Sequence, residues 1–160
     1  MVDIVDTKTR SRMMSGIRGQ DTRPEMVIRK GLQQLGFRHR LGNRYRLEGK
    51  LLPGRPDLVF PRFRAVIQVN GCFWHRHECH LFRWPGTRQQ FWRDKLEGNF
   101  QRDLLNQREL ESMGWRVLVI WECAIKGATN DEITILLNTA ANWVQFDVQS
   151  AVIEGGAAPQ

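Results

Sequence analysis

The chain lacks any long hydrophobic run, and its N-terminus lacks an apolar signal segment. No stretch of the 160 residues approaches the run of about 18 apolar residues that a membrane-spanning helix requires. Residues 1–18 are charged and polar, unlike the apolar centre of a secretory signal peptide. We therefore expect a cytosolic protein without a membrane partner.

Cysteine is scarce, and its count is odd. The three cysteines are Cys72, Cys79 and Cys123, and in a reducing compartment an odd number argues against a disulfide framework. Metal binding, catalysis and plain burial remain open for them. The sequence also lacks an internal repeat, and its length fits one compact domain.

Positive charge is in excess. The 24 Lys and Arg residues outnumber the 17 Asp and Glu residues, which gives a formal net charge of +7. Such a surplus favours a polyanionic partner, and nucleic acid is the first candidate. An acidic membrane surface, or simple solubility, would also agree with the charge alone.

Local patterns predict a mixed α/β sheet covered by helices. Thr22 and Glu25 fit the capping box of a helix that ends at Gly36, and residues 38–55 form a basic loop or hairpin. The remaining predicted elements are strands at 57–60, 65–69 and 115–121, and helices at about 88–113 and 131–143. We expect a basic arm (1–20), a main domain (21–148) and a disordered tail (149–160).

One short segment, residues 71–80, contains two cysteines, three histidines, a glutamate and two adjacent aromatic residues. Cys72, His77 and Cys79 lie close enough in the chain to bind one ion. Cys123 follows the strand at 115–121 and joins them if the two strands are neighbours. Three thiolates and one imidazole form a structural zinc site. His75 and His80 compete with His77 for this role, and buried cysteines without metal are the plain alternative.

A second metal site is indicated by Pro56-Asp57, with Gln68 and Asn70 on the next strand. This order is similar to the nuclease pattern in which acidic groups on adjacent strands hold Mg²⁺ for phosphodiester hydrolysis. Asp57 fits the first acidic position, whereas Gln68 and Asn70 are weak substitutes for the others. An ordinary turn aspartate is the alternative.

Further candidates for catalysis are His75, Glu25 and Asp103. A histidine with an ordinary pKa near about 6.5 suits proton transfer at neutral pH, so His75 is a candidate general base. Glu25 is also explained as half of a capping box, and Asp103 as part of a solvated helix face.

Aromatic side chains in the same region suit insertion between DNA bases. For Phe73 and Trp74 a core position and a DNA wedge are equally consistent with the sequence. Met14, with Met13 and Ile17, supplies a second apolar group among basic residues. We expect four other large rings in the core: Phe91, Trp115, Trp121 and Trp143.

A series of motifs between about residues 8 and 125 resembles one known family, the very short patch repair endonucleases. The motifs are Thr9-Arg10-Ser11 with Met14 and Ile17, Thr22-x-x-Glu25, Leu52-Pro53-Gly54-Arg55-Pro56-Asp57, Gly71-Cys72-Phe73-Trp74-His75, Thr87-Arg88 with Phe91-Trp92, Asn99 with Arg102-Asp103, and Gly114-Trp115-Arg116-Val117 through Trp121-Glu122-Cys123. The run Gly-Cys-Phe-Trp-His is the most specific of them.

The resemblance implies a restriction-endonuclease-like fold and Mg²⁺-dependent cleavage of one DNA strand. The cut lies 5′ to the thymine of a T·G mispair that arises from deamination of 5-methylcytosine. By matching position, Asp57 and the backbone carbonyl of Val69 would bind Mg²⁺, His75 would be the general base, and Glu25 would support the metal and its water.

The resemblance also assigns the other ligands. Zn²⁺ would be bound by Cys72, His77, Cys79 and Cys123. Phe73, Trp74 and Trp92 would enter the DNA beside the mismatch, with Met14 pressing in from the minor groove. The expected partners are mismatched double-stranded DNA and other repair proteins, and the protein is expected to act as a monomer near bacterial DNA.

Two departures from the family pattern stand out. The family has Thr-His before Gly-Cys-Phe-Trp-His, where this chain has Val69-Asn70, and the loop between Arg38 and Lys50 is longer than usual. Two alternatives therefore stay open. One is a sequence-specific nickase without mismatch preference, and the other is a non-catalytic, zinc-stabilised DNA-binding module.

Overall fold

The computed structural model describes residues 21–156. The basic arm predicted for residues 1–20, including Met14, lies outside the described residues, as do residues 157–160. The helices are α2 (Arg23–Gln34), α3 (Gln89–Ser112) and α4 (Asn130–Phe146). The strands are β1 (Arg40–Leu41), β2 (Arg46–Leu47), β3 (Lys50–Leu51), β4 (Leu58–Phe60), β5 (Ala65–Asn70), β6 (Arg116–Trp121) and β7 (Ala151–Ile153).

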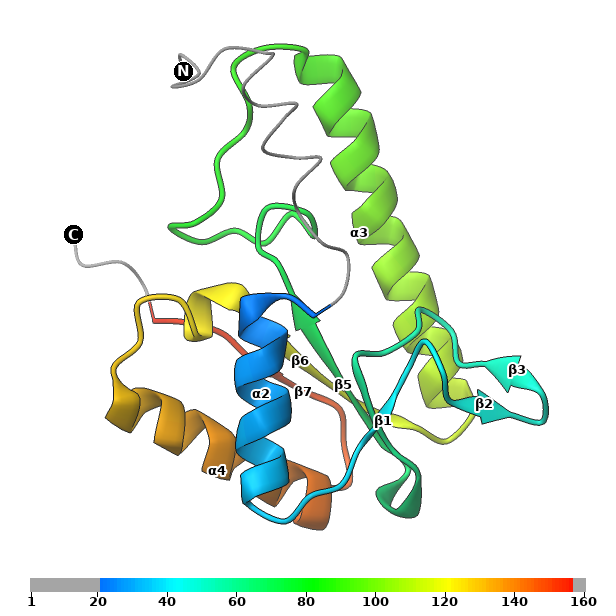
Figure 1. Ribbon diagram of the computed structural model, residues 1–160. Helices are drawn as coiled ribbons and strands as arrows, with labels where there is room; N and C mark the ends of the chain where they lie inside the picture. Colours follow the sequence, from blue (N-terminus) through cyan, green and yellow to red (C-terminus); the bar gives the residue numbers. More distant parts are fainter. Residues whose placement is uncertain (1–20, 157–160) are drawn as a thin grey trace.

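The main sheet has the strand order β1-β4-β5-β6-β7 (Figure 1). β4 is antiparallel to β1 and β5, whereas β5, β6 and β7 run parallel to one another. The β5–β6 pairing extends from Ala65 opposite Arg116 to Asn70 opposite Trp121. Both strands therefore end side by side, which brings the segments after Asn70 and after Trp121 to the same edge.

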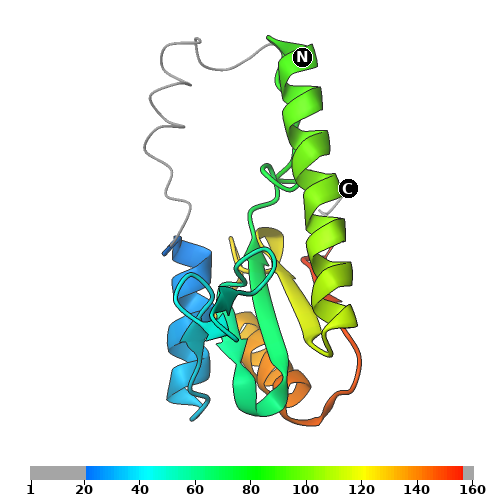
Figure 2. The same ribbon diagram turned by 90° about the vertical axis from the view of Figure 1, so that its right-hand side faces the viewer.

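Helices cover both faces of the sheet (Figure 2). Successive residues of the strands point to opposite faces, so the sheet has a separate hydrophobic core on each side. On one face, Ile28 and Leu32 of α2 pack with α4 against Ile67 and Leu118. On the other face, a second core beneath α3 consists of Leu52, Val59, Val66, Leu110, Trp115, Val117 and Val119. The predicted mixed α/β sheet flanked by helices is confirmed, and strand β6 is buried on both faces as its apolar run predicts.

Helix α3 is a long crossover between the parallel strands β5 and β6. Its N-terminal half extends beyond the sheet (Figure 1), and its buried residues are Trp92, Leu96 and Leu110. The helix ends where Gly114 adopts φ +88°, the left-handed conformation that glycine favours at such ends. Although α3 is long, none of the helices within residues 21–156 is apolar enough to span a membrane.

The structure corrects the prediction for the tail. Residues 149–160 were expected to be disordered, but Ala151–Ile153 form β7, which pairs in parallel with Leu118–Ile120 of β6. Three residues are too short for a clear alternating pattern, so the strand is fixed by its neighbour rather than by its own sequence. The basic segment 38–55 forms the short strand β1 and the hairpin β2–β3.

Candidate active site and metal centre

A polar pocket of about 270 Å³ lies at the end of β5, beside the start of β4 and of α2. Its walls include Glu25, Asp57, Val69, Asn70 and His75. These residues come from four separate segments of the chain, and the sheet topology brings them together. The pocket thus contains the acidic, carbonyl and imidazole groups that the sequence indicated.

Asp57 is a half-buried carboxylate of this pocket. Its Oδ2 accepts a hydrogen bond of 2.7 Å from the backbone N–H of Val69. The pKa of Asp57 is raised to about 7, mainly by burial. The Val69 hydrogen bond opposes this shift, and the nearby Glu25 adds to it. A bound cation would stabilise the ionised form of a carboxyl group with this pKa.

Val69 presents a second oxygen on the same side. In a β-strand, the N–H and C=O of one residue point in the same direction. Because the Val69 N–H points at Asp57, the Val69 carbonyl also faces that side. The pairing of β4 with β5 ends at Leu58 opposite Ile67, so Val69 lies beyond the paired part of these two strands. A carboxylate and a carbonyl oxygen are ligands that Mg²⁺ accepts.

Glu25 lies in the first turn of α2 and is buried. Its backbone N–H donates to the hydroxyl of the N-cap Thr22, which confirms the predicted helix start. Burial raises the pKa of its carboxyl, while the backbone N–H of Asp21 and the charge of Arg29 lower it. Glu25 also lines the pocket, which places it beside Asp57 as well as at the helix start.

His75 is held by a residue from α3. Its Nδ1 lies 2.5 Å from Oδ2 of Asp103, and the imidazole lines the pocket that contains Asp57. Asp103 is therefore bound to a histidine, whereas the sequence alone also allowed a solvated helix face. The contact leaves Nε2 of His75 as the other nitrogen able to exchange a proton.

Gln68 and Asn70 flank Val69 on β5, and both line the pocket. Asn70 is only 7% exposed, so this position, where the family pattern has histidine, is part of the pocket wall. An amide side chain does not ionise near neutral pH, so His75, rather than Asn70, supplies an imidazole to this wall.

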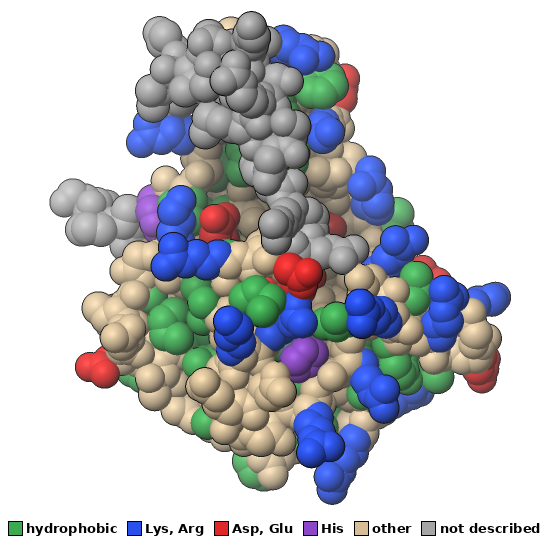
Figure 3. All heavy atoms as spheres, in the orientation of Figure 1, with side chains coloured by type: hydrophobic (Ala, Val, Ile, Leu, Met, Phe, Trp, Pro, Cys, Tyr) green, Lys and Arg blue, Asp and Glu red, His purple; other side chains and the backbone are tan. Residues whose placement is uncertain are grey.

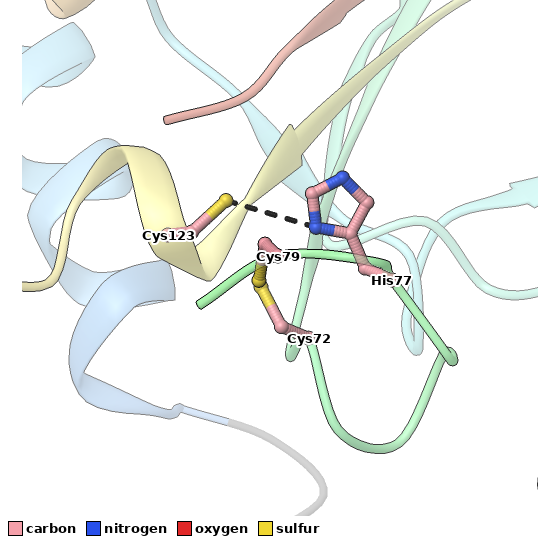
Figure 4. A group of neighbouring side chains, drawn as sticks. All are labelled: Cys72, His77, Cys79 and Cys123. Carbon is pink, nitrogen blue, oxygen red and sulfur yellow. Dashed lines mark hydrogen bonds between the residues drawn. The ribbon is translucent and has the colours of Figure 1, made fainter. Parts of the chain in front are cut away.

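The second site consists of Cys72, His77, Cys79 and Cys123, whose ligand atoms all lie within 4.8 Å of one another (Figure 4). The first three come from the turn after β5, and Cys123 comes from the 3₁₀ helix after β6 (Glu122–Ala124). Sγ of Cys123 is 3.7 Å from Nδ1 of His77. Zinc ligands at about 2.3 Å in a tetrahedron are separated by about 3.8 Å, so this group can hold a metal ion.

Neighbouring groups support metal binding by these residues. Nε2 of His77 lies 2.8 Å from a carboxylate oxygen of Glu154, leaving Nδ1 to face the sulfurs. The backbone N–H groups of Leu81 and Gly155 donate to Sγ of Cys79 and Cys123, respectively. A carboxylate behind a ligating histidine and donors directed at the sulfurs are typical of metal centres. Burial raises the pKa of Cys72, so a bound cation would be needed to keep its thiolate.

The sequence did not indicate two groups around this centre. Glu154 lies in the segment expected to be disordered, and no local pattern marked it. Glu122 accepts a hydrogen bond of 3.1 Å from the Cys72 backbone N–H, which ties the turn to the end of β6. The metal group excludes His75 and His80, which had been alternatives to His77.

An aromatic cluster stands beside the pocket, at the N-terminal part of α3. Phe73 contacts Trp74, Phe82 and Trp92, with ring centroids 5.2, 6.2 and 5.5 Å away. Phe73 and Trp74 are half-buried, whereas Trp92 is 5% exposed and lies against both. Phe73 and Trp74 are therefore partly exposed, and the buried Trp92 packs against both.

The expectation for other aromatic residues is partly wrong. Phe91, expected in the core, is 42% exposed, and its ring carries the guanidinium of Arg88 at 4.2 Å. Trp115 and Trp143 are buried as predicted. Trp121 is half-buried and stacks on His77, with ring centroids 4.0 Å apart.

Helix α3 holds three successive residues of the turn. Asn99 donates to the backbone carbonyl of Trp74 at 2.9 Å, and Asp103 binds His75. Arg76 pairs with Glu97 and places its guanidinium 4.2 Å from the Phe100 ring centre. The aromatic and imidazole groups are thus mounted between a metal centre and a helix.

Comparison with known proteins gives one consistent result. The sequence profile of the family described as DNA mismatch endonuclease Vsr matches residues 2–81. The chain is 38% identical over 154 residues to the DNA mismatch endonuclease Vsr of Escherichia coli (strain K12), and the match covers 96% of this chain and 95% of that protein.

Two other relatives are described as Type II nicking enzymes. V.XorIIP of Xanthomonas oryzae pv. oryzae is 41% identical, over 78% of this chain and 88% of its own. V.NmeAIP of Neisseria meningitidis serogroup A is 39% identical, over 79% of this chain and 86% of its own.

Proposed function

Because the chain belongs to the DNA mismatch endonuclease family Vsr, we propose that it nicks one strand of duplex DNA 5′ to the thymine of a T·G mispair. Such a mispair arises when 5-methylcytosine is deaminated, and the nick would initiate very short patch repair on DNA in the bacterial cytosol. The observation that carries the proposal is His75, which is bound by Asp103 and lines the Asp57 pocket beside a partly exposed aromatic pair.

In the proposed reaction, His75 is the general base. Asp103 binds Nδ1 and orients the ring, so Nε2 takes a proton from a water molecule. The water oxygen forms a bond to phosphorus as the bond between phosphorus and the leaving oxygen breaks. Positioned proton transfer of this kind contributes about 10²- to 10⁴-fold to rate.

Asp57 and the Val69 carbonyl are the proposed ligands of Mg²⁺, with Glu25 beside them in the pocket. When bound, Mg²⁺ neutralises charge on the phosphate and makes nearby water more acidic. The hard oxygen donors and the raised pKa of Asp57 fit a divalent cation of this type.

Zn²⁺ is the proposed ion of the second site, with Cys72, His77, Cys79 and Cys123 as its ligands. Three cysteines and one histidine form a closed set, which suits a structural rather than a catalytic ion. The ion would fasten the turn that carries His75 to the end of β6.

Phe73 and Trp74 are the proposed wedge. Inserting apolar rings between bases requires unstacking, which is least unfavourable at a mispair. Trp92 would support these rings from behind, since it is buried against both. Met14, which lies outside the described residues, is proposed to press in from the minor groove.

The test is a nicking assay with purified protein, Mg²⁺ and matched duplexes that contain either T·G or C·G at one position, across a library of flanking sequences. We expect cuts in T·G duplexes alone. His75→Ala and Asp57→Ala should abolish cutting and leave DNA binding largely intact. If no T·G context is cut, the proposal fails.

A second candidate is a nicking enzyme without mismatch preference, favoured by two relatives that are described as Type II nicking enzymes. It predicts equal cutting of T·G and C·G duplexes in one sequence context. A non-catalytic DNA-binding module predicts binding to DNA with or without Mg²⁺ and no cut in any context.

A further inference from the structure

Six basic side chains lie on and around the β2–β3 hairpin, and the proposed mechanism gives them no role. All six are exposed: Arg38, Arg40, Arg44, Arg46, Lys50 and Arg55. Between residues 38 and 56 the only acidic residue is Glu48. Within residues 21–156, no ion pair joins any of the six to a carboxylate. Figure 3 shows Lys and Arg side chains spread over this side of the molecule.

The hairpin is an ordered support for these charges. Glu48 and Gly49 form its two-residue turn, both with positive φ, as in the tight turns that join antiparallel strands. Its inner side packs on the second core, where Tyr45 meets Trp115 edge-on at 6.1 Å and Leu47 is partly buried. Since side chains alternate along a strand, Arg46 points away from that core, and Arg44, in the turn before β2, is exposed.

The base of the hairpin forms part of the pocket wall. Leu41, Gly42 and Asn43 on one side and Gly54, Arg55 and Pro56 on the other line the pocket with Asp57. The two sides touch so closely that a Cβ atom at Gly42 would lie 1.7 Å from the Pro56 carbonyl oxygen. The hairpin is therefore fixed relative to Asp57.

The hairpin and the aromatic cluster lie at different levels of α3. The hairpin residues Leu47, Lys50 and Pro53 share a hollow with Asn106, Glu109 and Met113 at the C-terminal end of α3 and its cap. Phe73 and Trp74 pack near Trp92, and Asp103 binds His75 between these levels. At a rise of about 1.5 Å per residue, Asp103 is about 16 Å from Trp92 and about 9 Å from Glu109 along the axis.

We propose that the β2–β3 hairpin, with Arg44, Arg46 and Lys50, binds backbone phosphates of the duplex on the side of the cut away from the aromatic cluster. The inference rests on the proposed function, because it takes the duplex to lie across the Asp57 pocket. Exposed guanidinium and ammonium groups without acidic partners bind phosphate and release counterions, independently of base sequence. The hairpin thereby extends the bound length of DNA without reading bases.

The test is the triple variant Arg44→Gln/Arg46→Gln/Lys50→Gln, compared with Lys30→Gln/Arg62→Gln/Lys126→Gln. The control removes the same charge from exposed residues on other elements. Affinity for a T·G duplex is measured against salt concentration without Mg²⁺. The hairpin variant should bind at least tenfold more weakly in low salt. The slope of log affinity against log salt concentration should also be smaller in magnitude by about 2–3, because each lost phosphate contact removes about 0.9 from it.

Two further measurements sharpen the test. The single-turnover nicking rate at saturating DNA should stay within about twofold of the unsubstituted protein. Shortening the duplex on one side of the mispair should abolish the difference in affinity, whereas shortening it on the other side should preserve it. Equal melting temperatures establish that the variants are folded, and the conservative pair Arg44→Lys/Arg46→Lys should keep most of the affinity.

Equal losses of affinity in the hairpin and control variants would overturn the proposal, since they would report net charge alone. An unchanged salt slope would also overturn it, as would a difference in affinity that survives both shortenings of the duplex. The outcome is separate from that of the proposed function, because binding is measured without cleavage. A protein that binds through the hairpin but cuts no T·G duplex would refute the proposed function alone.

Discussion

Nδ1 of His75 and Oδ2 of Asp103 lie 2.5 Å apart, although the residues are separated by 28 positions in the chain. His75 belongs to the turn after β5, and Asp103 lies in the middle of α3. The contact therefore exists only while the turn is packed on the helix. It joins the orientation of the proposed base to the tertiary structure around it.

Replacing Asp103 with asparagine should lower the single-turnover nicking rate by about 10²-fold or more, because the imidazole loses the negatively charged carboxylate that orients it. DNA affinity should change less than threefold. Asp103→Glu should restore part of the rate, and Glu109→Gln on the same helix is the control. A normal rate in Asp103→Asn would show that His75 does not depend on this contact.

Loss of Cys123 should release the metal. Cys123→Ser should reduce zinc content from one equivalent to a small fraction, measured by mass spectrometry. It should lower the melting temperature by about 10 °C or more, since structural zinc contributes several kcal/mol to folding. His80→Ala, in the same turn but outside the metal group, should keep both values. Zinc-free wild-type protein of full stability would contradict the assignment.

Glu154 should tune the metal site without being a ligand. Glu154→Gln removes the carboxylate charge beside Nε2 of His77, so zinc affinity in a chelator competition should fall by about 10- to 100-fold. At saturating zinc the stoichiometry should remain one. The control is Asp131→Asn at the exposed start of α4. Unchanged affinity would leave Glu154 with no part in the metal centre.

The raised pKa of the half-buried Asp57 carboxyl predicts that the stability of the protein depends on pH. Because its folded pKa is raised to about 7, the folded protein keeps a proton that the unfolded chain releases above about pH 4. The free energy of unfolding should therefore fall as pH rises from about 4 to about 7 and then level off.

Asp57→Asn removes this dependence. Without added Mg²⁺, the variant should be more stable than the wild type by about 2–4 kcal/mol at pH 8 and equal to it near pH 4, measured by denaturant unfolding. Glu48→Gln, an exposed acidic position, should show no such trend. Equal stabilities at pH 8 would mean that the Asp57 carboxylate is well solvated.

Sequence reasoning succeeded where chemistry or periodicity is local. The run Trp115–Trp121 predicted a buried strand, and its neighbour at 65–69 placed Cys123 beside the turn. Gly114 and Thr22 marked helix ends because their backbone or side-chain chemistry is specific to those positions. These features depend on few residues, and neighbouring elements do not override them.

Tertiary contacts decided what the sequence left open or predicted wrongly. Asp103 had the pattern of an exposed helix face, and only the packing of the turn on α3 gives it a histidine partner. β7 forms because it pairs with β6, and this pairing places the next residue, Glu154, beside His77 of the candidate metal site. Phe91 is exposed because α3 extends past the sheet, so no strand lies beneath that part of it.

The parallel pairing of β5 with β6 has a consequence for how such a chain can change. The aromatic rings, the imidazole and most of the metal ligands lie in the single connection between these two strands, residues 71–115. Six residue pairs fix the register of the strands, and the entropy of closing a connection rises only slowly with its length. Insertions in the irregular part at 80–88 would therefore reshape the surface beside the rings while Asp57 and the sheet stay in place.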